Sequence, residues 1–198
     1  GFSSPAILAL FVLGAACVPL FLWRERRARH PMLDLALFRN AEFSVSLLAG
    51  IFPFVCISGV IFLMPFYLTL VMGLSQRDTG LLMSVVPIVL GVVNPISGSL
   101  SDRYGVRPVS LAGLLLILVG YLAMTSLRVE MGPLEYVLRM LPVGLGMATF
   151  GSPNNSAIMG AVPAQRLGVA SGVLSMTRNL GQIAGVALLG SYFAGRLA

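Results

Sequence analysis

The chain has 198 residues, of which 57% are hydrophobic and 10% are charged, and its formal net charge is +6. Soluble domains carry roughly a quarter of charged residues, so this composition excludes a protein whose whole surface meets water. Nucleic-acid binding is also disfavoured, because the charges are too few and too scattered to form a stripe that follows phosphates. The composition therefore indicates an integral membrane protein.

Long apolar segments follow one another along the chain. A membrane-spanning helix needs about 20 mostly apolar residues, and segments longer than this indicate tilt, kinks or protruding ends. Prolines inside the second, third and fifth segments predict kinks, because proline removes a backbone donor. We predict an all-α integral membrane protein with six transmembrane helices over residues 4–23, 42–71, 79–100, 108–127, 134–160 and 168–195.

The segment between the first two spans is basic. It carries five arginines, and its later part is a short amphipathic stretch in which Leu35, Leu37 and Phe38 could lie among lipid headgroups. Arginine concentrates in alternate loops, at 24–40, at 101–107 and at Arg166, whereas each intervening loop holds one arginine and one acid. By the positive-inside rule the first span runs inward and the sixth ends outside.

Other residue types bear on an enzyme or metal function. Cys17 and Cys56 lie inside apolar runs, and His30, the single histidine, lies in the basic segment. None of them has the spacing of a metal site, and the chain shows no Ser/His/Asp or phosphate-cradling motif. We therefore expect no metal, no cofactor and no enzymatic activity.

A charged run lies between the third and fourth spans. Charge at a membrane boundary is costly unless it has a use. The residues that form its pattern are Gly98, Leu100, Asp102, Arg103, Gly105 and Arg107. This pattern resembles the cytoplasmic loop signature of the major facilitator superfamily, G-x-L-a-D-R-x-G-r-R, although Ser101 and Val106 depart from it.

The basic segment and the start of the next span carry a second pattern. Its residues are Glu25, Pro31, Leu33, Asp34, Leu35, Phe38, Arg39 and Phe43. This pattern resembles the connector that precedes the C-terminal half in fourteen-helix drug:proton antiporters. The resemblance implies a linker transmembrane helix at 1–23, a cytoplasmic basic connector at 24–41 and the first five helices of the C-terminal half at 42–198. The N-terminal half and the last helix would be missing.

The resemblance implies a function as well. We expect a fragment of a multi-pass plasma-membrane transporter that exports drugs or other hydrophobic or cationic compounds in exchange for protons, by alternating access. Its partners would be membrane lipids, a small-molecule substrate, protons and the missing N-terminal half, with no nucleic acid. The alternatives are an exporter or importer of another small metabolite, and a truncated membrane scaffold without transport activity.

The charged run is the first candidate site. Gly98 and Gly105 would allow the tight turn, and the resemblance implies a cytoplasmic gating loop in which Asp102, Arg103 and Arg107 act as a latch. The alternative is that these charges only fix the topology and the shape of the loop.

Arg178 is the first candidate for the transport pathway. It lies about ten residues into the sixth span, roughly 15 Å deep, where an arginine that faces lipid would cost at least about 2.5 kcal/mol. Gln182 shares its face at i, i+4, and Asn179 adds polarity. Arg178 would line the pathway or clamp two helices together by hydrogen bonds.

Further polar residues lie in the other spans. Arg139 resembles the arginine of the superfamily's R-x-x-q-G motif, but Pro142 replaces the glutamine, so that snorkelling to the outer interface is favoured. Asn94, and Asn154 with Asn155, could line a cavity or bond to a neighbouring helix. No acid lies at the midplane of a span, so a titrating carboxylate is expected on the missing half.

Small residues in the last span predict close helix packing. Gly181 and Gly185 have the small-xxx-small spacing, and Gly190 lies beyond them.

Overall fold

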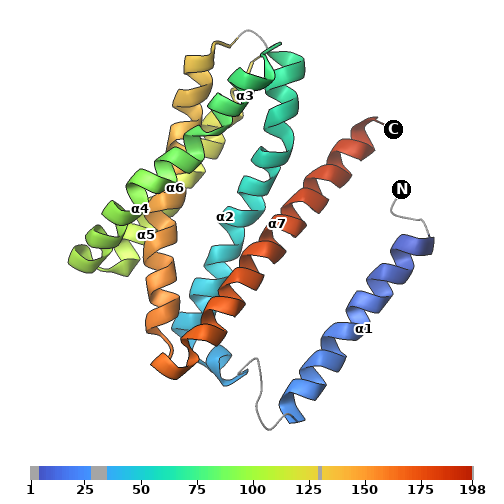
Figure 1. Ribbon diagram of the computed structural model, residues 1–198, viewed down its shortest axis with the longest axis vertical. Coiled ribbons are helices and arrows are strands. Elements are labelled where there is room, and N and C mark those ends of the chain that lie inside the picture. The colour runs from blue at the N-terminus through green and yellow to red at the C-terminus, as the bar shows by residue number, and fades with distance from the viewer. Residues whose placement is uncertain (1–4, 28–34, 129–130, 198) are drawn as a thin grey trace.

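A computed structural model describes residues 5–27, 35–128 and 131–197. In these ranges every regular element is a helix, which confirms the all-α prediction. Figure 1 shows α1 standing apart from the bundle that α2, α4, α5, α6 and α7 form. The elements are α1 (Pro5–Arg27), η1 (Leu35–Arg39), α2 (Ala41–Phe66), η2 (Tyr67–Val71), α3 (Gln76–Met83), α4 (Val85–Tyr104), α5 (Val106–Met124), α6 (Pro133–Gly160), η3 (Ala164–Arg166) and α7 (Leu167–Leu197).

The number of membrane crossings is supported in part. Three segments of the described chain are long and apolar enough to cross a membrane: Ala41–Val71, Gln76–Tyr104 and Val106–Met124. The helices over Pro133–Gly160 and Ala164–Tyr192 pass the same criteria only as a pair bent by 115°. Thus three of the six predicted spans correspond to helical segments long and apolar enough to cross a membrane, and the crossings at 4–23, 134–160 and 168–195 stay predictions.

The start of α2 is fixed by Asn40. Its side-chain Oδ1 accepts hydrogen bonds from the backbone N–H groups of Glu42 (2.9 Å) and Phe43 (3.4 Å), as an N-cap does. Its Nδ2 donates to the carbonyl oxygen of Ala161 at 3.1 Å and thereby ties α2 to the end of α6. Leu37 is buried among core side chains of this end, so the prediction that it lies among lipid headgroups is wrong. The preceding part of the connector, 28–34, lies outside the described residues.

The third predicted span is broken into two helices. α3 ends and α4 begins at Ser84, whose hydroxyl donates to the carbonyl oxygen of Leu81 at 2.6 Å. Pro87 lies in the first turn of α4, where its missing N–H would have no partner within the helix in any case. The proline therefore favours the start of a new helix at this point.

α5 and α6 pack backbone against backbone. A Cβ atom added to Gly146 would lie 2.5 Å from the nitrogen of Ile117 and 2.7 Å from the carbonyl oxygen of Gly113. Gly113 in turn leaves room for the backbone of Phe150, and Gly120 for that of Val143. Glycine at these positions permits the close approach that membrane helices use for packing.

α2 and α7 form a second close pair. Cβ atoms added to Gly181 and Gly185 would meet the backbone of α2, and one added to Gly59 would meet Leu189 on α7. The small-residue prediction is thus confirmed at Gly181 and Gly185, whereas Gly190 faces open space. The bundle consists of two packed groups, α4–α5–α6 and α2–α7, which meet where α2 and α7 touch α6.

Candidate functional site

A polar cluster joins the two helix groups at Arg178. Its guanidinium Nη2 on α7 donates to the side-chain Oδ1 of Asn155 on α6 at 2.7 Å. The same guanidinium carbon lies over the ring of Phe54 on α2, 5.4 Å from the ring centroid. An arginine over an aromatic face gains a cation–π interaction, which strengthens when water is excluded. Arg178 therefore connects three helices, as the predicted clamp would.

The cluster borders a small cavity. Its volume is about 30 Å³, and Asn154, Thr177 and Arg178 are among the residues that line it. The Nε atom of Arg178 is buried and has no hydrogen-bond partner among the described residues. A single water occupies roughly 30 Å³ in the liquid and binds where polar groups lack partners, so the cavity has the size and polarity to hold one.

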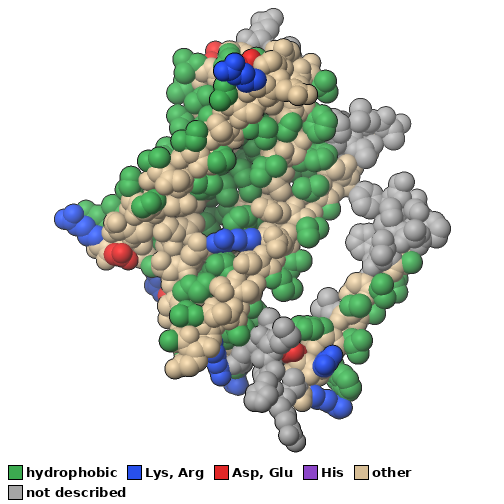
Figure 2. Space-filling view, in the orientation of Figure 1, with side chains coloured by type: hydrophobic (Ala, Val, Ile, Leu, Met, Phe, Trp, Pro, Cys, Tyr) green, Lys and Arg blue, Asp and Glu red, His purple; other side chains and the backbone are tan. Residues whose placement is uncertain are grey.

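A larger apolar cleft lies beside this cavity, with a volume of about 290 Å³. Figure 2 shows hydrophobic side chains gathered along the hollow between α4 and α6 on one side and α2 and α7 on the other. Phe54 and Met147 line both the cleft and the small cavity. Its lining also includes Met64, Met83, Pro87, Tyr136, Met140 and Gln182.

An inner groove runs between α2, α5 and α6, with a volume of about 620 Å³. Its lining is apolar apart from five polar residues, Glu42, Ser46, Arg107, Ser110 and Asn154. Asn154 lines both this groove and the small cavity at Arg178, and its side chain is 6% exposed. Asn154 therefore lies between the inner groove and the small cavity at Arg178.

Most of the charged run between α4 and α5 is helical, and only one of its residues lies outside the two helices. Asp102 and Arg103 belong to the last turn of α4, Arg107 to the first turn of α5, and Gly105 alone links the helices. Gly105 has φ +90° and its N–H donates to the carbonyl oxygen of Ser101 at 2.8 Å. The prediction of a turn of several residues is therefore wrong, because one glycine with a positive φ suffices.

The other residues of this run differ in their surroundings. Gly98 lies inside α4, where an added Cβ would come 3.1 Å from the hydroxyl of Ser152, so it serves helix packing. The Asp102 side chain is exposed and has no hydrogen bond or ion pair within the part of the chain that the structure describes. The Arg103 guanidinium lies 5.6 Å from the ring centroid of Tyr104. Asp102 is thus available to a group outside this segment.

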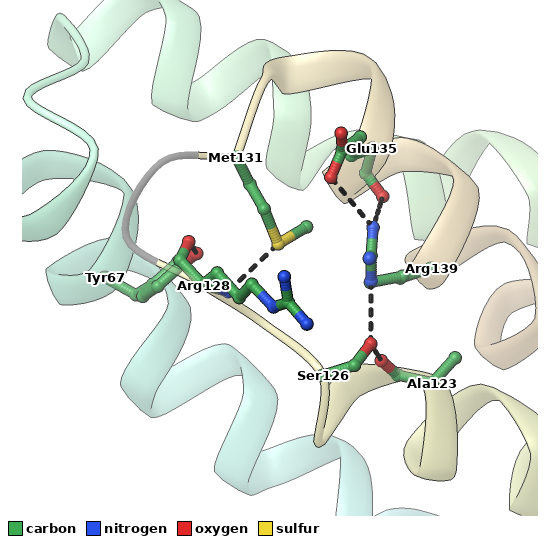
Figure 3. Close-up of polar contacts among 7 residues, drawn as sticks. All are labelled: Tyr67, Ala123, Ser126, Arg128, Met131, Glu135 and Arg139. Carbon is green, nitrogen blue, oxygen red and sulfur yellow. Dashed lines mark hydrogen bonds and ion pairs between the residues drawn. The ribbon is translucent and has the colours of Figure 1, made fainter.

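Arg139 belongs to a separate network at the opposite end of the bundle, shown in Figure 3. Its Nε donates to the hydroxyl of Ser126 at 3.0 Å, and its Nη1 lies 3.4 Å from the Glu135 carboxylate. Tyr67 donates its hydroxyl to the carbonyl oxygen of Arg128 at 2.6 Å in the same region. Ser126 and Glu135 thus hold Arg139 at the α5–α6 connection and away from Arg178, and its role at the outer interface stays a prediction.

The structure thus brings together only some of the predicted pathway residues. Arg178, Gln182 and Asn154 surround the connected cavity and cleft. Asn94 is half-buried and Asn179 exposed, and neither lines these spaces. The sequence had marked Asn155 only as a polar residue in an apolar helix. It gave no signal for Phe54 or Tyr136, because an aromatic residue in a span is ordinary.

Comparisons with known proteins identify the family. The model of the Major Facilitator Superfamily matches residues 1–186. Over 186 residues, covering 92% of this chain and 41% of the relative, the chain is 34% identical to the riboflavin transporter RibZ of Clostridioides difficile. It is 34% identical over 196 residues to the multidrug resistance protein Stp of Mycobacterium tuberculosis, covering 99% of this chain and 36% of the relative.

A third relative is the multidrug efflux pump LfrA of Mycolicibacterium smegmatis, 31% identical over 194 residues, which cover 96% of this chain and 38% of the relative. The chain therefore spans about two-fifths of the length of these curated relatives. With the match over 1–186 and an all-helical bundle of apolar segments, the chain belongs to the major facilitator superfamily of membrane transporters.

Proposed function

We propose that this chain is the C-terminal portion of a proton-coupled exporter of drugs or other hydrophobic or cationic compounds in the plasma membrane. The observation that carries the proposal is the arginine cluster within the bundle, where Arg178, Asn155 and Phe54 meet beside an apolar cleft. A charged group this far from the helix ends is costly in a membrane unless it has a partner or a function. The names of two multidrug relatives support export as the direction.

Alternating access fits the arrangement of the helices. The α2–α7 pair and the α4–α5–α6 group are each packed through glycines, and the Arg178–Asn155 hydrogen bond crosses between them. A change in the relative position of the two groups would alter this bond and the shape of the cleft beside it. We propose that the N-terminal half covers this face and that the substrate lies between the halves near the midplane.

The charged run has a complementary role in the proposal. Asp102 is exposed at the inner end of α4 and lacks a partner within the described residues, so that a group on the N-terminal half can bind it in one conformation. Such a latch would set the balance between inward-open and outward-open states. Proton coupling would use a carboxylate of the N-terminal half, because the acids that the structure describes all lie at helix ends: Glu25, Glu42, Asp78, Asp102 and Glu135.

The test uses the full-length transporter in everted membrane vesicles with Nile red, a neutral hydrophobic dye, as the substrate. Respiration imposes a proton gradient, and the fall in Nile red fluorescence reports its transfer out of the membrane. We expect transport that stops when an ionophore collapses the gradient, and that is lost in the Arg178→Ala variant. Arg77→Gln changes an exposed arginine on α3 and is the matched control. Transport that continues at the same rate after the ionophore collapses the proton gradient would refute the proton coupling.

A second candidate function is transport of a small metabolite, favoured by the similarity to the riboflavin transporter. The same vesicles supplied with riboflavin separate the two functions, since a drug exporter would move Nile red and not riboflavin. If neither compound nor a wider panel of drugs moves, the chain acts as a membrane scaffold.

A further inference from the structure

Methionine and aromatic side chains form much of the lining of the apolar cleft. Phe54 and Tyr136 supply two aromatic rings, and four methionines, Met64, Met83, Met140 and Met147, supply thioethers. Methionine adapts its shape and makes favourable sulfur–aromatic contacts, and aromatic rings stack on flat partners. The volume of about 290 Å³ is at the lower end of drug-sized sites, so that the cleft suits one fused ring system of a larger molecule.

Tyr136 is the second observation that points to a ligand. Its side chain is 1% exposed, and its hydroxyl has no hydrogen-bond partner within the described residues. Buried polar atoms in folded proteins nearly always have a partner. Tyr136 lines the cleft, so a ligand with a hydrogen-bond acceptor can supply that partner. The amide of Gln182 is the other side chain in the lining with a hydrogen-bonding group.

The charge near the cleft is positive. Phe54, which lines the cleft, lies under the Arg178 guanidinium at 5.4 Å from ring centroid to guanidinium carbon. Among the described residues that line the cleft and the small cavity, none is acidic. A cation in the cleft would therefore meet an arginine with no carboxylate from this segment to offset the repulsion, and repulsion between like charges is strong where water is excluded.

We propose that this cleft binds the aromatic ring system of a neutral or anionic substrate, with an acceptor atom bound by the Tyr136 hydroxyl, and that Arg178 selects against cations. The inference rests on the proposed transport function. It narrows the substrate class from hydrophobic or cationic drugs to flat compounds without positive charge.

The test measures binding to the purified full-length transporter with two dyes that share a xanthene ring system. Fluorescein is anionic and tetramethylrhodamine methyl ester is cationic, and fluorescence anisotropy gives the dissociation constant of each. We expect fluorescein to bind more tightly. Arg178→Gln should reduce this preference about tenfold, which corresponds to about 1.4 kcal/mol, whereas Arg178→Lys, which keeps the charge, should retain most of it.

Tyr136→Phe tests the hydrogen bond separately from the charge. Loss of one neutral hydrogen bond should weaken fluorescein binding roughly threefold to tenfold and leave the effect of Arg178→Gln intact. Arg77→Gln, outside the cleft, should change neither dissociation constant. Circular dichroism of each variant shows that it is folded.

Tighter binding of the cationic dye, or a preference that Arg178→Gln leaves unchanged, would overturn the inference. Binding does not depend on transport, so the proposed function is judged independently. Selective binding of fluorescein without its movement into everted vesicles would support the inference and contradict the proposed exporter.

Discussion

The close contact of α5 and α6 predicts opposite effects for two alanine substitutions in the same helix. At Gly146 the added Cβ would lie 2.5 Å from one backbone atom and 2.7 Å from another, and neither can rotate away as a side chain can. Overpacking costs about 1–3 kcal/mol, and rigid backbone on the facing helix places Gly146→Ala in the upper half of that range. Alanine recovers about 1 kcal/mol of helix propensity over glycine, so the net loss is about 1–2 kcal/mol.

Gly151 is the matched control, because it lies in α6 and no atom comes within 4 Å of its added Cβ. Gly151→Ala should gain up to about 1 kcal/mol from propensity alone, so that the two variants differ by about 2–3 kcal/mol. The assay is reversible unfolding of the full-length transporter in mixed micelles with a rising fraction of SDS, followed by far-ultraviolet circular dichroism. If Gly146→Ala unfolds at or above the SDS fraction of the parent protein, the two helices are not packed as closely as described.

Three further predictions use the same unfolding assay. Asn155→Leu removes the acceptor of the Arg178 guanidinium and should lower the free energy of unfolding by about 1.5–3 kcal/mol; an unchanged value would show that this bond does not hold α6 to α7. Gly105→Ala should lower the free energy of unfolding by about 1–3 kcal/mol because φ is +90° there. Gly91→Ala, whose added Cβ meets open space, should not lower it. Equal effects of the two substitutions would contradict the positive φ. Asp102→Asn should leave the free energy of unfolding within about 0.5 kcal/mol of the parent value but abolish Nile red transport, and normal transport would exclude the latch.

The sequence predicted the positions of the helices because length and apolarity dominate in a membrane protein. The predicted segment 42–71 corresponds to Ala41–Val71, and 134–160 to Pro133–Gly160. The spacing of Gly181 and Gly185 also predicted their contacts with α2. The sequence did not predict the glycine contacts between α5 and α6, because Gly113 and Gly120 are seven residues apart and the backbone atoms that they meet belong to Phe150 and Val143 on another helix. Contacts between helices depend on their relative rotation, which hydropathy does not encode.

The site was predicted less completely than the fold. Arg178 stood out because its charge lies deep in an apolar span, but its acceptor Asn155 is 23 residues away on another helix. Arg139 was included through a resemblance, whereas Ser126 and Glu135 bind it locally. Tyr136 and Phe54 acquire meaning only from the cleft that they line, since aromatic residues in a span are ordinary.

Gly105, the single-residue link between α4 and α5, is the point at which the angle between the two helices would change. Peptide planarity leaves two soft torsions at Gly105, and α5 extends 19 residues beyond it, which at 1.5 Å per residue is about 28 Å. A change of about 10° in one torsion, about an axis across the helix, would displace the far end of α5 by about 5 Å. That end leads to the connection where Tyr67 binds the Arg128 carbonyl and Arg139 binds Ser126. The hydrogen bonds of Tyr67 and Arg139 therefore lie at the end of α5 that such a rotation would displace most.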